Sequence, residues 1–357
     1  MHIFNSQIHH WYSKFKRDLP WRNTRDPYFI WLSEIILQQT RIDQGLGYYL
    51  KFTEEFPTIS DLANATEDQV LKLWQGLGYY SRARNLHFTA KFITVQYYGK
   101  FPDKYHKLLL LKGIGEYTAA AIASISFNEE YPTVDGNVFR VLSRFFGIAD
   151  PIDTTAGKKI FRELATELIK GTDPGMHNQA LMEFGALQCT PKKPNCMECP
   201  LKVQCYAFLT HRTGEFPVKL KKTKQRDRYF NYFILLYEDF TYLKKRVGKD
   251  IWENLFEFPM IETSSAINIE SLLSMPEVMQ IIPRPRDQSI VEKIEDWKIH
   301  LLTHQRINYR MITVRLLQKN QMPDELIRVN KKDIFNFAVP KLIETHLKTN
   351  RENEFFI

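Results

Sequence analysis

The sequence predicts a two-domain protein in which an all-α domain is followed by an α+β domain. The chain has 357 residues, more than one hydrophobic core usually serves. Helix signals dominate up to about residue 215, whereas β-branched and aromatic runs appear after residue 228. The densest basic stretch, Lys219 to Arg228, lies between the two parts. We therefore expect a helical domain over 1–215, a basic linker over 216–228 and an α+β domain over 229–357.

The composition is that of a globular protein. Hydrophobic residues make up 44% and charged residues 25%, which excludes a disordered, collagen-like or coiled-coil chain. No apolar run is long enough to span a bilayer, and the first residues lack the basic start and apolar core of a signal peptide. We expect a cytoplasmic, monomeric protein without disulfides. The formal net charge of +8 and the basic linker are compatible with contacts to phosphates, although a solvated linker is the simpler interpretation.

Helix signals recur along the first part of the chain. Asp26-Pro27 predicts a helix start before an apolar stretch, and Thr66-Glu67-Asp68 predicts another. Gly76-Leu77-Gly78 breaks the pattern before a further helical segment from Tyr79 to Tyr97. The segment Tyr117 to Ser126 is rich in alanine and apolar on all sides, so we expect a buried helix there.

The second part alternates strand and helix patterns. Tyr229 to Tyr237 and Thr241 to Val247 flank the short turn Glu238-Asp239 and predict a hairpin. Further strands are expected at Trp297 to Thr303 and Ile307 to Leu317, and helices at Ala266 to Ser274 and Lys331 to Leu347.

All four cysteines fall in one short segment, with six, two and five residues between Cys189, Cys196, Cys199 and Cys205. Four thiols in one loop of a reducing compartment indicate a metal centre. Structural zinc usually takes two close pairs of cysteines, and only one such pair is present. The looser spacing favours a [4Fe–4S] cluster, with zinc and unliganded thiols as alternatives.

Glu34 is the most conspicuous carboxylate in the sequence. It lies in the apolar run Phe29 to Leu37 and shares a helix face with Ile30 and Leu37. Such a carboxyl should be desolvated, which raises its pKa and favours the protonated acid. The alternative is a glutamate that points into solvent or pairs with a buried arginine.

Two weaker signals follow along the chain. Gly113 and Gly115 precede the buried helix, where a phosphate could approach the backbone, or where the chain simply turns. Asp135 precedes a glycine, and an isolated aspartate in that position is usually a turn or N-cap residue.

Together these motifs resemble the MutY group within the endonuclease III, or helix–hairpin–helix, superfamily of DNA glycosylases. The cysteine spacing and the hairpin glycines resemble the superfamily. The MutY-like strings are Leu19-Pro20-Trp21-Arg22, the run from Trp31 to Thr40, and the run from Trp74 to Leu86. The resemblance covers about residues 8 to 210. It implies an all-α helix–hairpin–helix glycosylase domain with a [4Fe–4S] cluster loop.

The resemblance also implies an activity and its site. Enzymes of this type flip out adenine opposite 8-oxoguanine or G in double-stranded DNA and hydrolyse its N-glycosidic bond. Glu34 would protonate adenine at N7, and Asp135 would stabilise the oxocarbenium-like sugar, assisted by Tyr117 and Asn137. The matching base-pocket residues are Trp21, Arg22, Leu37 and Gln179. The matching DNA contacts are Gln39, Tyr79, Gly113 and Gly115, with Lys192, Lys193 and Lys202 of the cysteine loop placed to meet phosphates.

The C-terminal part resembles a Nudix-like lesion-recognition domain. Trp252 to Pro259 resembles a Nudix strand, and His300 to His304 matches a loop that probes 8-oxoguanine, with Thr303 and His304 keeping its hydroxyl and imidazole. Leu302 departs from the aromatic residue usual there. A Nudix hydrolase is disfavoured, because Met260 to Glu270 has too few carboxylates for a Mg²⁺ site.

Two further classes of protein are distinguished by the residues at a few positions. A bifunctional glycosylase–lyase of the endonuclease III type would have its nucleophilic lysine where Tyr117 stands. A DNA-binding iron–sulfur protein without catalysis would be expected to lack Glu34 or Asp135, and both are present.

Overall fold

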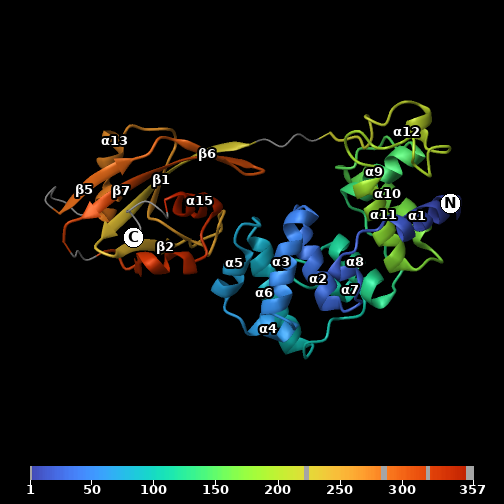
Figure 1. The fold of residues 1–357 in the computed structure, drawn as a ribbon, viewed down its shortest axis with the longest axis horizontal. Coiled ribbons are helices and arrows are strands. Elements are labelled where there is room, and N and C mark those ends of the chain that lie inside the picture. Colours follow the sequence, from blue (N-terminus) through green and yellow to red (C-terminus); the bar gives the residue numbers. More distant parts are fainter. Residues whose placement is uncertain (1, 221–224, 283–287, 319–321, 351–357) are drawn as a thin grey trace. The chain divides into compact units, whose positions relative to one another are not determined.

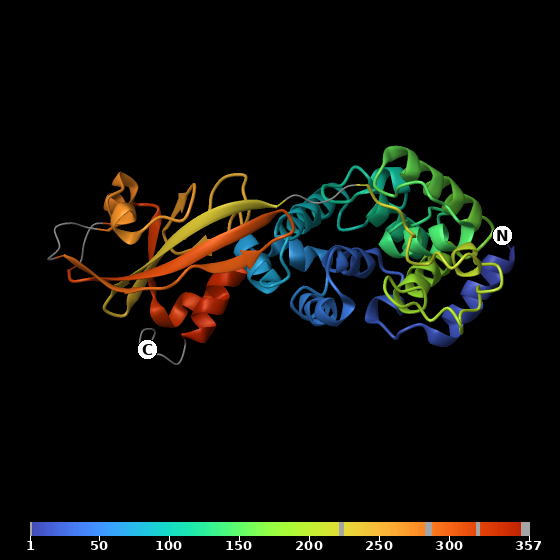
Figure 2. The same cartoon turned by 90° about the horizontal axis from the view of Figure 1, so that it is seen from above.

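The chain folds into two compact units. A computed structural model describes residues 2–220, 225–282, 288–318 and 322–350 (Figures 1 and 2). The N-terminal unit contains residues 1–65 and 85–221, and the C-terminal unit contains residues 66–84 and 222–357. The segment 66–84, which the sequence analysis assigns to the helical domain, thus packs with the C-terminal unit. No helix in the described ranges is both long and apolar enough to cross a membrane.

The N-terminal unit is all-α, as predicted. Its elements are α1 (His2–Phe15), η1 (Pro20–Arg22), α2 (Pro27–Leu37), α3 (Ile42–Glu55), α4 (Ile59–Asn64), most of α6 (Ser81–Gln96), α7 (Tyr105–Leu108), α8 (Glu116–Phe127), α9 (Gly136–Phe146), α10 (Thr155–Ile169), α11 (Pro174–Leu187) and α12 (Tyr206–Leu209). The α8 helix packs against α2 and α11, and every residue from Thr118 to Ile125 is buried. This confirms the predicted buried helix.

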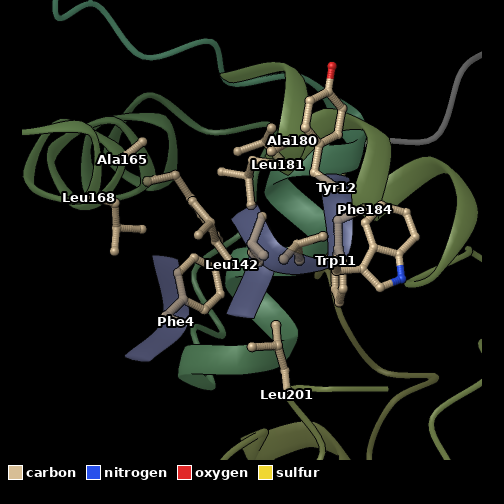
Figure 3. Close-up of a cluster of buried hydrophobic side chains, with 14 of the residues drawn as sticks. Phe4, Trp11, Tyr12, Leu142, Ala165, Leu168, Ala180, Leu181, Phe184 and Leu201 are labelled. Atoms are coloured by element: carbon tan, nitrogen blue, oxygen red, sulfur yellow. The ribbon is translucent and has the colours of Figure 1, made fainter. Parts of the chain in front are cut away.

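One large core lies among α1, α9, α10 and α11 (Figure 3). The ring of Trp11 meets that of Phe184 edge-on, with 5.0 Å between centroids, and Phe4 contacts Phe145 at 4.7 Å. Burial of each such aromatic side chain contributes about 2–3 kcal/mol. This core joins the N-terminal helix to α11, so distant parts of the sequence support the same site.

Local capping fixes where several helices begin. The carboxylate of Asp26 accepts a hydrogen bond from Tyr28 N at 2.9 Å, with Pro27 at the first helical position of α2. Thr66 and Gln69 form a reciprocal capping box at the start of α5 (Glu67–Trp74). Both helix starts predicted from the sequence are therefore confirmed.

The C-terminal unit is built on one mixed sheet. Its strands are β1 (Arg226–Tyr237), β2 (Phe240–Lys245), β3 (Phe256–Glu257), β4 (Met260–Thr263), β5 (Ser289–Ile294), β6 (Lys298–Leu301), β7 (Gln305–Leu316) and β8 (Leu326–Asn330). The main strand order is β3-β2-β1-β7-β5. The two long central strands, β1 and β7, are parallel. Their register pairs Arg226 with Gln305 at one end and Leu236 with Arg315 at the other. The other pairings among the described strands are antiparallel.

Two predicted elements of this unit differ from the structure. The segment Lys331 to Leu347 is not one helix but the 3₁₀ turn η2 (Lys331–Asn336) followed by α15 (Lys341–Thr349). Pro340 lacks an N–H and disfavours helical dihedrals in the preceding residue, so the helix must restart. Trp252 to Pro259 is mostly a turn, since Trp252 and Asn254 have positive φ and only two residues form β3.

Shorter corrections concern the remaining helices and strands. The helix expected at Ala266 to Ser274 is confined to α13 (Ile269–Leu273), because Asn268 caps its start. The short helix α14 (Pro276–Ile281) and the strands β4, β5 and β8 were not predicted.

Polar side chains link the segment 66–84 to the rest of the C-terminal unit. Asp68 pairs with Lys245 at 2.6 Å, and Arg84 pairs with Glu253 at 2.6 Å. The Lys72 ammonium donates to the Phe337 carbonyl at 3.1 Å. These contacts make the predicted DNA-contacting residue Tyr79 part of the same unit as Thr303 and His304.

Candidate active site

Glu34 lies on α2 in the wall shared by two cavities of the N-terminal unit. The larger one, about 960 Å³, is also lined by Tyr117 and Asp135. The smaller one, about 40 Å³, is lined by Trp21, Arg22, Ile30, Ser33, Glu34, Ile125, Gln179 and Met182. The helix face predicted from the sequence is therefore the face that meets both cavities, with Ile30 in the small one and Leu37 in the large one.

The surroundings of Glu34 favour its protonated form. Burial raises the pKa of Glu34 to about 7, and the negative charge of Asp135 also raises it. A hydrogen bond with Tyr117 and the positive charge of Arg22 act in the opposite direction. This agrees with the desolvated carboxyl expected from the apolar run around it.

Asp135 is the N-cap of α9 and faces the large cavity. One carboxylate oxygen accepts from Asn137 N at 2.9 Å and Val138 N at 2.8 Å, and the other accepts from Asn137 Nδ2 at 2.7 Å. Burial raises the pKa of Asp135, and these three bonds oppose that shift because they favour the anion. Asp135 therefore caps α9 and at the same time presents its carboxylate to the large cavity.

A buried arginine holds Asn137 in place. The guanidinium of Arg140 donates to Asn137 Oδ1 at 2.8 Å, and to the carbonyls of Gly185 and Cys189, both at 2.6 Å. A Cβ at Gly185 would lie 2.7 Å from that of Asn137, so only glycine permits this close approach of α11 to α9. No local pattern singles out Arg140, because the Gly185 and Cys189 carbonyls that it binds come from a distant segment.

Tyr117 lies in the first turn of α8 and lines the large cavity together with Glu34. Its hydroxyl contacts Met182 Sδ at 3.1 Å and hydrogen-bonds with the carboxyl of Glu34. Burial raises the pKa of Tyr117 well above its usual value, with both carboxylates adding to the effect. The phenol therefore stays neutral beside Glu34.

The base-pocket residues predicted from the sequence meet at the small cavity, except Leu37, which lines the large one. Arg22 donates two hydrogen bonds to Glu183, at 2.8 and 2.7 Å, and Glu183 also pairs with Arg17 at 2.6 Å. These bonds outweigh burial and lower the pKa of Glu183 to about 2. Gln179 is held by the hydroxyl of Tyr12, which donates to Gln179 Oε1 at 3.0 Å.

Sequence reasoning missed Glu183, Tyr12 and Met182. All three lie on α1 or α11. The one available signal was that Glu183 interrupts an apolar stretch of α11, as Glu34 interrupts that of α2.

The predicted DNA-contacting residues fall into two groups. In the N-terminal unit, Gln39 lines the large cavity with a positive φ, and Gly115 caps α8. Gly113 has a φ of +80° and packs so closely on Asn85 that a Cβ would collide with it. In the C-terminal unit, the hydroxyls of Tyr79 and Thr303 are hydrogen-bonded at 2.5 Å, and both side chains are exposed. His304 is also exposed, and its carbonyl accepts from Arg226 N at 3.0 Å.

The four cysteines are free thiols in a partly buried loop between α11 and α12. Burial raises the pKa of Cys199 to about 12, and the charges of Cys189, Cys205 and Cys196 add to the shift. Arg144 donates to Cys189 Sγ at 3.4 Å and to the Thr190 carbonyl at 2.7 Å, which orders the loop. Among the described residues no three His, Cys, Asp or Glu side chains converge on one ion. Four thiols in one loop are a donor set of the kind that thiolate-ligated metal centres use.

Comparison with known proteins defines the class. A model described as HhH-GPD superfamily base excision DNA repair protein matches residues 32–169, and a NUDIX domain model matches residues 231–349. The structure of a thermostable thymine-DNA glycosylase is similar with a TM-score of 0.55 at 31% identity, over 58% of this chain and 96% of that one. A non-covalent endonuclease III–DNA complex shares the fold, with a TM-score of 0.51 at 19% identity, over 59% and 95% of the two chains. The chain is a helix–hairpin–helix DNA N-glycosylase followed by a Nudix-like domain.

Relatives narrow this class to one family. The adenine DNA glycosylase of Buchnera aphidicola subsp. Acyrthosiphon pisum is 33% identical over 99% of both chains. That of Buchnera aphidicola subsp. Schizaphis graminum is 35% identical over 85% of this chain and 87% of its own. The Homo sapiens enzyme is 42% identical over 57% of this chain and 39% of its own. This protein belongs to the adenine DNA glycosylase family.

Proposed function

We propose that this enzyme removes adenine lying opposite 8-oxoguanine or G in duplex DNA, by base flipping and hydrolysis of the N-glycosidic bond. The observation that carries the proposal is the position of Glu34 between the small and the large cavity, with Asp135 in the wall of the large one. An extruded nucleotide would place its sugar in the large cavity and direct its base towards the residues of the small one, which must widen to admit a purine. The glycosidic bond then lies between an acid and an anion.

Glu34 acts as the general acid. A pKa of about 7 leaves a substantial protonated fraction at neutral pH, and the carboxyl can deliver its proton to adenine N7. A neutral base is a far better leaving group than its anion. The neutral phenol of Tyr117 orients the carboxyl as the proton leaves.

Asp135 stabilises the positive charge that develops on the sugar. Its three hydrogen bonds and the N-terminus of α9 hold the anion in a fixed position, so no reorganisation is needed when the charge appears. Asn137 completes this arrangement and is itself held by Arg140.

Arg22 and Gln179 recognise the base within the small cavity, against Trp21 and beside Leu37. The Glu183 carboxylate fixes the guanidinium of Arg22, which reduces the entropy lost on binding. DNA is held by Gly113 and Gly115 at the start of α8, where backbone N–H groups attract a phosphate. Gln39 and Tyr79 fill the space left by the flipped base, while Thr303 and His304 read the opposite base. The enzyme acts as a monomer on double-stranded DNA.

Cys189, Cys196, Cys199 and Cys205 hold a [4Fe–4S] cluster in this proposal. Such a cluster supplies structural stability and, where accessible, electron transfer. The ordered loop carries Lys192, Lys193 and Lys202, which are placed to meet DNA phosphates.

An excision assay on duplexes with A opposite 8-oxoguanine, G, C or T tests the proposed function. We expect rapid release of adenine opposite 8-oxoguanine, slower release opposite G, and little release opposite C or T. Equal rates on all four duplexes, or none, would contradict it.

The enzyme should be a glycosylase without strong lyase activity. Tyr117 occupies the position of the lyase lysine, so borohydride added during turnover should trap little covalent complex, and Tyr117→Lys should introduce some trapping. Efficient trapping by the wild type would favour the bifunctional alternative.

The value of kcat/KM should fall both at alkaline and at acidic pH. Glu34 must be protonated, so kcat/KM should fall as pH rises through about 7. Asp135 must be ionised, so kcat/KM should fall again in acid, at a pH above the usual range of an aspartate because burial raises its pKa. Single-turnover rates over the full range check both declines. A profile that is flat through pH 7 in both the wild type and Glu34→Gln would exclude the acid role.

Thr303→Ala combined with His304→Ala should lower activity on A opposite 8-oxoguanine selectively. The expected loss is about 1–3 kcal/mol of discrimination, the size of a base-edge contact. Tyr79→Phe is the matched control: it removes the hydroxyl bonded to Thr303 but keeps the ring. Equal losses of the double variant on 8-oxoguanine and G substrates would reject a reading role for this loop.

A further inference from the structure

One wall of the large cavity has no role in the mechanism above. Lys158, Arg162 and Thr166 lie four residues apart on α10, so they share one face of the helix, and all three line the cavity that contains Glu34 and Asp135. Lys158 and Arg162 are exposed. Two cations thus face the space where the sugar and its neighbouring phosphates would lie.

Arg162 already has an anionic partner on the hairpin. It pairs with Glu116, the first residue of α8, directly after Gly115. The two side chains are 54% and 61% exposed, so the ion pair is solvated and its separation costs little free energy. Glu116 benefits from the positive end of the α8 dipole, which is also what would attract a phosphate. The carboxylate therefore lies at a helix N-terminus, where a phosphate anion would also be stabilised.

The other charged groups around this face are engaged elsewhere. On α10, Glu163 pairs with Lys159 at 3.8 Å and Glu167 pairs with Lys170 at 2.6 Å. Glu130, also in the cavity wall, accepts from Gly171 N at 2.9 Å. Within the described ranges, Lys158 forms no ion pair. A phosphate at this face would therefore meet the Lys158 ammonium and the Arg162–Glu116 pair, with the Glu130 carboxylate as a further charge in the cavity wall.

We propose that Lys158 and Arg162 form a binding site for a backbone phosphate of the substrate strand beside the hairpin. In the absence of DNA, Glu116 holds Arg162. When DNA binds, Arg162 exchanges the carboxylate for the phosphate, and Lys158 contacts the same stretch of backbone. This inference deepens the proposed function, because it assigns a second phosphate contact to the same cavity.

Salt-dependent binding to an undamaged duplex tests the site. Lys158→Gln and Arg162→Gln should each reduce the slope of log K against log salt by about 1, the value for one phosphate contact, and weaken binding about threefold or more at low salt. Lys159→Gln is the matched control: it removes the same charge from the same helix, but at a position that does not line the cavity. Arg162→Lys should restore most of the slope.

Glu116→Gln provides a second, opposite readout. It releases Arg162 and removes a negative charge next to the phosphate, so binding should tighten, by about two- to fivefold at low salt. Slopes for Lys158→Gln and Arg162→Gln equal to that of Lys159→Gln, or weaker binding by Glu116→Gln, would overturn the proposal. Circular dichroism melts check that each variant is folded.

The assay separates this inference from the proposed function. Binding to undamaged DNA involves no excision, so a protein that shows the expected slopes but releases no adenine would refute the mechanism and leave the phosphate site standing. Normal adenine release with unchanged slopes would reject the phosphate site alone.

Discussion

Glu34→Gln is expected to abolish adenine excision while leaving folding and DNA binding close to those of the wild type. The amide keeps the size of the side chain but cannot supply a proton, and loss of a general acid typically costs about 10²–10⁴-fold in rate. Excision of adenine opposite 8-oxoguanine under single-turnover conditions measures the loss. The pKa shift of Glu34 to about 7 makes the carboxyl the group in this site best matched to acid catalysis at neutral pH.

Glu130→Gln is the matched control for this prediction. Glu130 lines the same cavity, but it accepts a single hydrogen bond from Gly171 N, which the amide oxygen of glutamine can also accept. Its rate should remain near that of the wild type. Excision by Glu34→Gln at the rate of Glu130→Gln would refute the assignment of the acid.

Asp135→Asn should reduce excision by about 10²–10³-fold, the scale of an electrostatic contact removed from a preorganised site. Asparagine is as good an N-cap as aspartate, so α9 should keep its start and the melting temperature should change little. The charge that stabilises the sugar is lost, although the side-chain oxygen still accepts from the backbone N–H groups. The measurement is the single-turnover rate together with a thermal melt.

Asp173→Asn serves as the control for the second prediction. Asp173 caps α11 in the same way, through Met176 N at 2.9 Å, and does not line either cavity. It should retain wild-type excision. If Asp135→Asn and Asp173→Asn lose activity equally, the effect of Asp135 is on helix stability and not on catalysis.

Both members of the Glu34 and Asp135 pair were recognisable in the sequence because their positions follow local rules. The 3.6-residue period places Glu34 on the face of Ile30 and Leu37, whatever the rest of the chain does. Asp135 precedes a glycine at a helix start, where a capping carboxylate is expected, although only the resemblance to the glycosylases distinguished it from an ordinary cap. The capped starts of α2 and α5 and the all-apolar α8 were likewise predictable from short windows.

The partners of these residues were not predictable in the same way. Glu183 binds Arg22, which is 161 residues away in the sequence, and Arg140 binds the carbonyl of Cys189, which is 49 residues away. Neither contact has a local signal, since each depends on which helices pack together. The same holds for the segment 66–84, whose helical pattern is local but whose place in the C-terminal unit depends on pairs such as Lys245 with Asp68.

By itself, the sequence determined the helical first part and the mixed second part, the acidic residue in an apolar helix face, and the four-cysteine loop. Only the tertiary structure decided that Glu34 separates two cavities, that Glu183 and Arg140 position the residues around them, and that Arg162 reaches the hairpin at Glu116. The physical reason is that helix period and capping act over a few residues. Burial, cavities and pKa shifts instead arise when segments far apart in the chain exclude water together.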